Sequence, residues 1–131
     1  MKFIEKLLSK NSCEKAVVIG KHGELIAEKL LKKQGYKIIE RNFNARFGEI
    51  DIIAQDGEYT CFVEVRMRKS DAHGSPAETI DKFKREKIVR AARIYIQKHN
   101  LYDTPLRFDA VAIVGDLHNY KYEVIKNAFE L

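Results

Sequence analysis

Apolar residues near the start of the chain recur at helical spacing. Three of them carry the pattern: Ile26, Leu30 and Leu31. We predict a helix over residues 16–34 that ends at Gly35, because glycine commonly follows the last turn of a helix. Gly20 and Gly23 predict a break before the main part of this helix, since glycine is a poor helix former.

The period then changes from helical to alternating. Segments 36–42, 49–55 and 59–68 are rich in β-branched and aromatic residues, and the last two alternate between one face and the other. Asp56-Gly57, which separates these two segments, is a strong signal for a tight hairpin. The pattern therefore predicts a meander of three antiparallel strands.

A second helix is predicted over residues 76–99. It begins with a capping box made by Ser75 and Glu78, and Pro76 occupies its first turn. Two further strands are predicted over 106–114 and 120–125. A long helix between the third and fourth strands favours a crossover connection, so we expect these two strands to be parallel and the sheet to be mixed.

Composition and charge narrow the class of protein. The chain has 131 residues, of which 45% are hydrophobic, so we expect one domain over 16–131, preceded by a short amphipathic helix over 1–15. Two cysteines are too few for a disulfide scaffold, and no apolar run approaches the roughly 20 residues of a membrane span. We therefore expect a cytoplasmic protein without a membrane partner. Its net charge of +5 is compatible with a polyanionic partner.

Acidic residues gather on the predicted hairpin. A two-residue turn at Asp56-Gly57 makes Asp51 face Phe62 and puts Glu64 diagonally opposite Asp51. Four polar side chains then share one face of the sheet: Glu49, Asp51, Glu64 and Arg66. Carboxylates on adjacent strands repel one another unless a cation neutralises them, and Mg²⁺ binds through one or two carboxylates plus water and phosphate oxygens. The pattern is typical of a metal-dependent nuclease, in which Arg66 would hold the phosphate. The alternative is a solvated polar strand face.

Basic residues surround the same region in the sequence. The helix over 76–99 carries seven of them: Lys82, Lys84, Arg85, Lys87, Arg90, Arg93 and Lys98. We expect Lys82, Arg85 and Lys87, together with Arg41, Arg46 and Arg68 on or beside the strands, to contact nucleic-acid phosphates. A solvated helix face is the alternative. The segment 43–48 is predicted to be a loop, in which Phe43 or Phe47 either stacks on a base or packs in the core.

Two other residues are assigned to the interior. Asp109 lies in the middle of a predicted strand, where we expect a structural ion pair with Arg107 or a helix amine. Cys61 falls on the apolar side of its strand and is expected to be buried. The four histidines show no spacing typical of zinc ligands.

The spacing of the acidic residues also carries a resemblance. Asp51 is followed, after twelve residues, by Glu64-Val65-Arg66. This spacing resembles the signature of the PD-(D/E)XK nuclease superfamily. GEIDIIA and FVEVR together, within a likeness that spans about residues 20–129, resemble the YraN-like bacterial family, which is similar to archaeal Holliday-junction resolvases. The resemblance implies a restriction-endonuclease-like α/β fold, with an αβββαβ core and a mixed central sheet.

The resemblance also implies a site for Mg²⁺ or Mn²⁺. Its ligands would be Asp51, Glu64, the backbone carbonyl of Val65 and, from the first helix, Glu24. Lys84 aligns with a lysine of the family. The signature has lysine where this chain has Arg66, and arginine keeps the positive charge but cannot act as a base.

Two functions follow as expectations. The first is a metal-dependent endonuclease for structured or branched DNA, with Asp51, Glu64, Arg66 and Lys84 as its catalytic residues and with a homodimer as one possible assembly. The alternative is a nucleic-acid-binding module without catalytic activity on the same fold. A protein-interaction domain is a third hypothesis.

Overall fold

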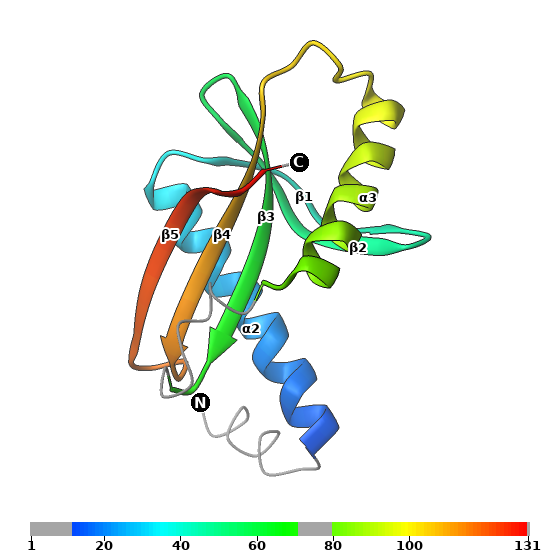
Figure 1. Ribbon diagram of the computed structural model, residues 1–131. Helices are drawn as coiled ribbons and strands as arrows, with labels where there is room; N and C mark the ends of the chain where they lie inside the picture. The colour runs from blue at the N-terminus through cyan, green and yellow to red at the C-terminus, as the bar shows by residue number, and fades with distance from the viewer. Residues whose placement is uncertain (1–11, 71–79, 131) are drawn as a thin grey trace.

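The computed structural model describes residues 12–70 and 80–130 (Figure 1). Seven elements follow one another along the chain: α2 (Ser12–Lys33), β1 (Lys37–Ala45), β2 (Gly48–Asp56), β3 (Tyr59–Arg68), α3 (Lys82–His99), β4 (Leu106–Gly115) and β5 (Tyr120–Phe129). The sheet has the strand order β1-β2-β3-β4-β5. β3 and β4 are parallel, and the other neighbouring strands are antiparallel. The predicted fold class is confirmed: this is an α/β fold with a mixed sheet, compatible with a restriction-endonuclease-like αβββαβ core.

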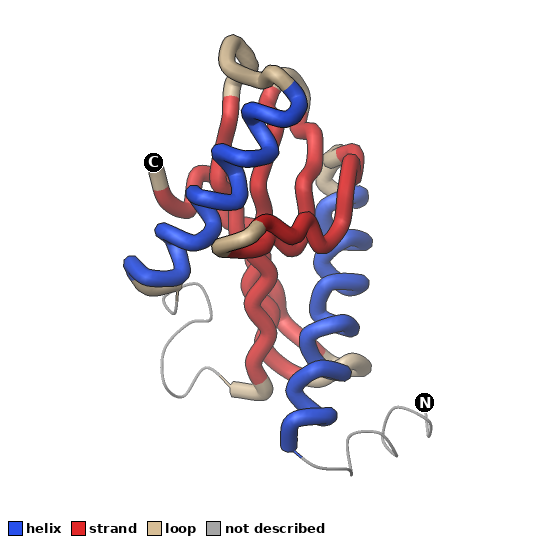
Figure 2. Tube along the Cα trace, turned by 90° about the vertical axis from the view of Figure 1, so that its right-hand side faces the viewer, coloured by secondary structure: helices blue, strands red, loops and turns tan. Residues whose placement is uncertain are grey.

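The two helices cover opposite faces of the sheet, which Figure 2 shows edge-on between them. The core on the α2 side includes Leu31 of α2 with Cys61 and Val63 of β3. The core on the α3 side includes Phe62 of β3 with Tyr95 of α3. Successive β3 residues therefore point to opposite layers, and both faces of this central strand are apolar because each is covered. The expected burial of Cys61 is confirmed.

α2 is one continuous helix, so the predicted break at Gly20 and Gly23 is wrong. A Cβ atom on Gly23 would lie 3.3 Å from the Cβ atom of Met67, which shows that this glycine lets α2 approach β3 closely. The predicted end is correct: Gly35 has φ +91, and its N–H donates to the carbonyl of Lys32 in a Schellman motif. Residues 12–15 of the predicted lead-in helix belong to α2, and its first eleven residues lie outside the described part.

α3 begins at Lys82, six residues later than predicted. Asp81 is its N-cap, and its Oδ1 accepts a hydrogen bond of 2.8 Å from the backbone N–H of Lys84. A continuous helix over 76–99 is therefore wrong at residues 80 and 81, while the predicted capping box at Ser75–Glu78 lies outside the described residues. The end of α3 is as predicted, with Asn100 in the left-handed conformation. In the described ranges, neither helix is long and apolar enough to cross a membrane.

The β2–β3 register differs from the predicted one by two residues. Asp56 pairs with Tyr59 and Ile53 pairs with Phe62, so Gly57 and Glu58 form the turn. Gly57 has φ +61, as the first central residue of a type II′ turn requires. A shift of two residues moves Glu64 from a diagonal position to one opposite Asp51. The alternation of β2 is interrupted at Asp51, since Ile50 packs on the α3 side and Ile52 packs on the α2 side.

The segment 43–48 is a hairpin and not the predicted loop. Ala45 pairs with Gly48 across a turn made by Arg46 and Phe47. Phe43 is buried in the core on the α3 side, whereas Phe47 is 57% exposed. The two alternatives for these phenylalanines are thereby separated: Phe43 packs in the core, and only Phe47 is available to a ligand.

Candidate metal and nucleic-acid site

Asp51 lies where β2 and β3 separate. The paired residues of these strands run from the turn to Ile52 and Val63. One residue further, Asp51 Oδ2 accepts a hydrogen bond of 2.8 Å from the backbone N–H of Val65. In a regular β-ladder the Val65 N–H would donate to a backbone carbonyl of β2. Here it donates to the Asp51 carboxylate, and this hydrogen bond holds Asp51 beside Glu64. The proximity predicted for the two carboxylates is confirmed.

Glu64 is buried next to a like charge. It is 4% exposed, and Asp51 is 9% exposed. Burial raises the pKa of Glu64 well above its ordinary value, and the charge of Asp51 raises it further. Two cations oppose this effect: Lys84 Nζ is 3.6 Å and Arg66 Nε is 3.5 Å from Glu64 Oε1. The four residues predicted to be catalytic therefore meet in one place.

Glu24 approaches this pair from α2. Burial raises the pKa of Glu24, and the charge of Asp51 adds to the increase. Asn42 has φ +50, a left-handed conformation that asparagine tolerates better than most residues. With its amide oriented to donate, Asn42 Nδ2 lies 3.1 Å from Glu24 Oε2. Asn42 therefore fixes the side chain of Glu24 on the α2 side of Asp51.

The chemistry of this site fits a hard divalent cation. Within the described ranges, no group of three or more His, Cys, Asp or Glu side chains is arranged to hold a metal ion. Asp51 and Glu64 nevertheless form an adjacent pair of oxygen donors, and one or two carboxylates with water and phosphate oxygens suffice for Mg²⁺. A cation between them would remove the repulsion that raises the pKa of Glu64. The carboxylate chemistry and the burial of Asp51 and Glu64 are therefore compatible with a metal ion bound by this pair.

A basic groove adjoins the carboxylates. Its volume is about 580 Å³, and it lies between the β1–β2 turn and the first half of α3. Four cationic residues line it: Arg46, Lys84, Lys87 and Arg90. Lys84 links the groove to the carboxylate pair through its contact with Glu64. Arg46 and Lys87, both predicted to bind nucleic acid, therefore lie together beside Lys84.

Other residues predicted to bind nucleic acid do not line this groove, although Arg41 lines a second pocket together with Glu24 and Asp51. Arg41 forms a two-pronged ion pair with Glu28, whose pKa it lowers to about 2. Arg85 donates to the carbonyl of Ile80 at 3.0 Å, and its guanidinium lies 5.7 Å from the centre of the Phe129 ring. Lys82 and Arg68 are not among the residues that line the groove.

Sequence reasoning missed Phe83, which lines the groove and is 66% exposed. The helical periodicity of the segment that forms α3 could have identified this residue. Phe83 falls outside the apolar stripe of α3, which includes Ile88 and Tyr95, and Lys87 lies four positions away on the same side of the helix. A large apolar residue on a charged helix face is a candidate contact residue.

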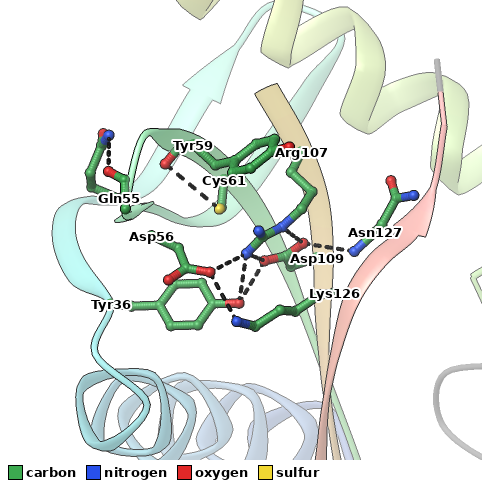
Figure 3. Close-up of polar contacts among 10 residues, drawn as sticks. Tyr36, Gln55, Asp56, Tyr59, Cys61, Arg107, Asp109, Lys126 and Asn127 are labelled. Carbon is green, nitrogen blue, oxygen red and sulfur yellow. Dashed lines mark hydrogen bonds and ion pairs between the residues drawn. The ribbon is translucent and has the colours of Figure 1, made fainter. Parts of the chain in front are cut away.

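A second polar cluster lies at the turn end of β2 and β3 (Figure 3). Asp109 is fully buried and accepts hydrogen bonds from the Arg107 guanidinium, from the Tyr36 hydroxyl at 2.7 Å and from the Asn127 backbone N–H at 2.9 Å. Arg107 also binds Asp56 at 2.6 Å. The predicted structural ion pair of Asp109 with Arg107 is confirmed.

The α2-sheet-α3 layers and the carboxylate pair on the central hairpin define an α/β protein compatible with a restriction-endonuclease-like core. Residues 23–113 match the family described as "Uncharacterised protein family UPF0102". The chain belongs to this family, which confirms the resemblance to the YraN-like proteins.

Curated relatives cover nearly the whole chain. A UPF0102 protein of Hahella chejuensis is 47% identical over 116 residues, which are 88% of this chain and 92% of the relative. A UPF0102 protein of Geotalea uraniireducens is 46% identical over 114 residues, 86% of this chain and 90% of the relative. One of Clostridium kluyveri is 42% identical over 115 residues, 86% of this chain and 94% of the relative.

Proposed function

We propose that this protein is a metal-dependent endonuclease that acts on structured or branched DNA. The observation that carries the proposal is the buried pair Asp51 and Glu64, which lies beside two cations, one of which, Lys84, also lines a basic groove. A buried pair of like charges is costly unless a cation joins it. A phosphodiester in the adjoining groove would place its charge next to that cation.

Each residue of the site has a role in this proposal. Asp51 and Glu64 bind Mg²⁺ or Mn²⁺ together with the Val65 carbonyl, and Glu24 adds negative charge from α2. The metal supplies Lewis acidity and an activated water molecule when bound. An arginine side chain does not act as a base in proteins, so Arg66 neutralises and orients the phosphate. Lys84 contacts Glu64 on one side and lines the groove on the other, so it orients the phosphate at the metal.

A cleavage assay tests the proposal. Purified protein is incubated with flapped, branched, single-stranded and duplex DNA in Mg²⁺ or Mn²⁺. We expect cleavage of at least one non-duplex substrate, and a loss of about a hundredfold or more in Asp51→Asn and Glu64→Gln. Glu58→Gln, which alters an exposed acidic residue in the β2–β3 turn, is the matched control and retains activity. Equal rates in all four proteins would contradict the proposal.

The second candidate is a nucleic-acid-binding module without catalytic activity. Arg66 favours it, because this residue replaces the lysine of the nuclease signature. This candidate predicts DNA binding with a steep salt dependence but no cleavage of any of the four substrates with either metal. Absence of DNA binding at low salt would contradict both candidates.

A further inference from the structure

Two phenylalanine rings flank the basic groove and face solvent. Phe47 lies in the β1–β2 turn and is 57% exposed, and Phe83 lies in the first turn of α3 and is 66% exposed. Each ring is close to a cation: Arg46 Cζ is 5.2 Å from the centre of the Phe47 ring, and Lys87 Nζ is 4.5 Å from that of Phe83. Rings that contribute so little to the core are available to a planar ligand.

The walls of the groove are held in place by close packing. A Cβ atom on Gly48 would lie 2.4 Å from the backbone carbonyl oxygen of Lys87. Only glycine therefore allows the start of β2 to lie this close to α3, and Figure 1 shows the β1–β2 hairpin alongside that helix. The turn that carries Phe47 and the helix that carries Phe83 are thus fixed next to each other.

The charge of the groove suits a phosphodiester chain. Its lining contains four cations and two carboxylates, Glu49 and Glu86. Anionic phosphates that alternate with planar bases match a surface on which cations alternate with exposed rings. In a duplex the base faces are stacked inside the helix, so rings on a protein surface reach them only where bases are unpaired. The groove chemistry therefore favours a single strand.

We propose that this groove is a stacking site for the bases of a single-stranded segment, which Phe47 and Phe83 bind and which leads to the carboxylate pair. The substrate class is thus DNA with an unpaired strand, such as a flap or a single-stranded end, and not a fully paired duplex. This inference rests on the proposed function, because the bound strand is the one that reaches Asp51 and Glu64.

The test measures binding without cleavage. The full chain, in buffer with a chelator, is titrated onto a 12-nucleotide single strand that carries one 2-aminopurine, and onto a duplex of the same length. We expect the single strand to bind at least about tenfold more tightly and its 2-aminopurine fluorescence to be quenched by stacking. Phe47→Leu and Phe83→Leu each weaken binding about tenfold and restore the fluorescence, without changing the salt slope.

Two matched controls separate stacking from other effects. Tyr102→Leu changes an equally exposed aromatic residue, 66% exposed, beyond the other end of α3, and binds like the wild type. Arg90→Gln lowers the salt slope by about 0.7, as loss of one phosphate contact to a single strand does, and leaves the quenching intact. All four variants alter exposed side chains, and circular dichroism verifies their folding.

The outcomes distinguish this inference from the proposed function. If both phenylalanine variants bind like Tyr102→Leu, or if the duplex binds as tightly as the single strand, the inference is wrong. Cleavage that depends on Asp51 would then still support the proposed nuclease. If the wild type binds neither DNA at low salt, the inference and the proposed function both fail.

Discussion

Two buried acidic clusters lie in this sheet, and they differ in how their charge is neutralised. Asp109 is fully buried and accepts hydrogen bonds from a guanidinium, a hydroxyl and a backbone N–H (Figure 3). Glu64 is almost as buried, yet its nearest cations lie at 3.5 and 3.6 Å and its other neighbour is the carboxylate of Asp51. The chain supplies close partners to the first cluster and leaves two like charges together in the second.

This difference separates a structural cluster from a candidate functional one. A buried charge that the protein itself satisfies contributes to one ordered fold, and removing a partner from it is strongly destabilising. A pair of buried like charges lowers stability, and such strain is common at sites that bind ligands. Matched isosteric substitutions in the two clusters should therefore change stability in opposite directions.

The largest effect is expected at Asp109. Asp109→Asn keeps the shape of the side chain but leaves the partly buried guanidinium of Arg107 with less compensation, so we expect a loss of about 3 kcal/mol in the free energy of unfolding. Urea denaturation measures it. A loss below about 0.5 kcal/mol would mean that the cluster is not the structural element described here.

A smaller effect of opposite sign is expected at Asp51. Asp51→Asn keeps an oxygen that can accept from the Val65 N–H but removes the charge beside Glu64. In a chelator, at neutral pH, we expect the free energy of unfolding to rise by about 1 kcal/mol. Glu58→Gln, in the exposed turn, serves as the control and should change it by less than about 0.5 kcal/mol. Destabilisation by Asp51→Asn would remove the contrast between the clusters.

The pH dependence of the metal-free protein sharpens the same contrast. The pKa of Glu64 is raised in the folded state from its ordinary value of 4.5, so the folded state binds more protons than the unfolded state above that pH. The contribution of Glu64 to stability therefore falls as pH rises from about 4.5 towards the raised pKa. Urea denaturation across this range should show the fall in the wild type and a smaller fall in Asp51→Asn. Identical profiles would contradict the coupling of the two carboxylates.

The smallest effect is expected at the ion pair between buried Glu28 and exposed Arg41. Arg41 lowers the pKa of Glu28 to about 2, so the stability that Glu28 contributes is present above its ordinary pKa and is lost only as pH falls towards 2. Arg41→Gln should raise the pKa of Glu28, as measured by NMR titration, and lower the free energy of unfolding at neutral pH only slightly, because Arg41 is exposed and Lys32 still neutralises the carboxylate. An unchanged pKa would show that Arg41 does not neutralise Glu28.

Local patterns predicted the strands of the carboxylate hairpin well. β3 has the predicted bounds, because its alternation of apolar and polar residues reports directly on a strand between two layers. The register was wrong by two residues because Asp56 belongs to the strand, where Arg107 and Lys126 bind its carboxylate. These partners lie far along the chain, so a rule based on the turn alone could not anticipate them. Asp51 and Glu64 stayed neighbours because the error was an even number of residues, although the alternation of β2 is interrupted between Ile50 and Ile52.

Long-range contacts explain what the sequence could not show about the sites. The pairing of Asp109 with Arg107 was predictable because two residues separate them on one strand, whereas Tyr36 and Asn127 reach Asp109 only through the folded topology. Arg41 was assigned to nucleic acid because its partner Glu28 lies on another element. The role of Asn42 depends on a left-handed backbone conformation that no periodic pattern reports.

The proposed function depends on a divalent cation that Asp51 and Glu64 bind together. Calorimetric titration of the chelator-free protein with Mn²⁺ at pH 7, in two buffers of different ionisation enthalpy, tests this binding most directly. We expect saturable binding accompanied by proton release to the buffer, because the metal displaces the proton from a carboxyl with a raised pKa. We also expect Asp51→Asn and Glu64→Gln each to abolish this binding while Glu58→Gln retains it. Equal Mn²⁺ binding by all four proteins, or no binding by the wild type, would contradict the proposed metal site.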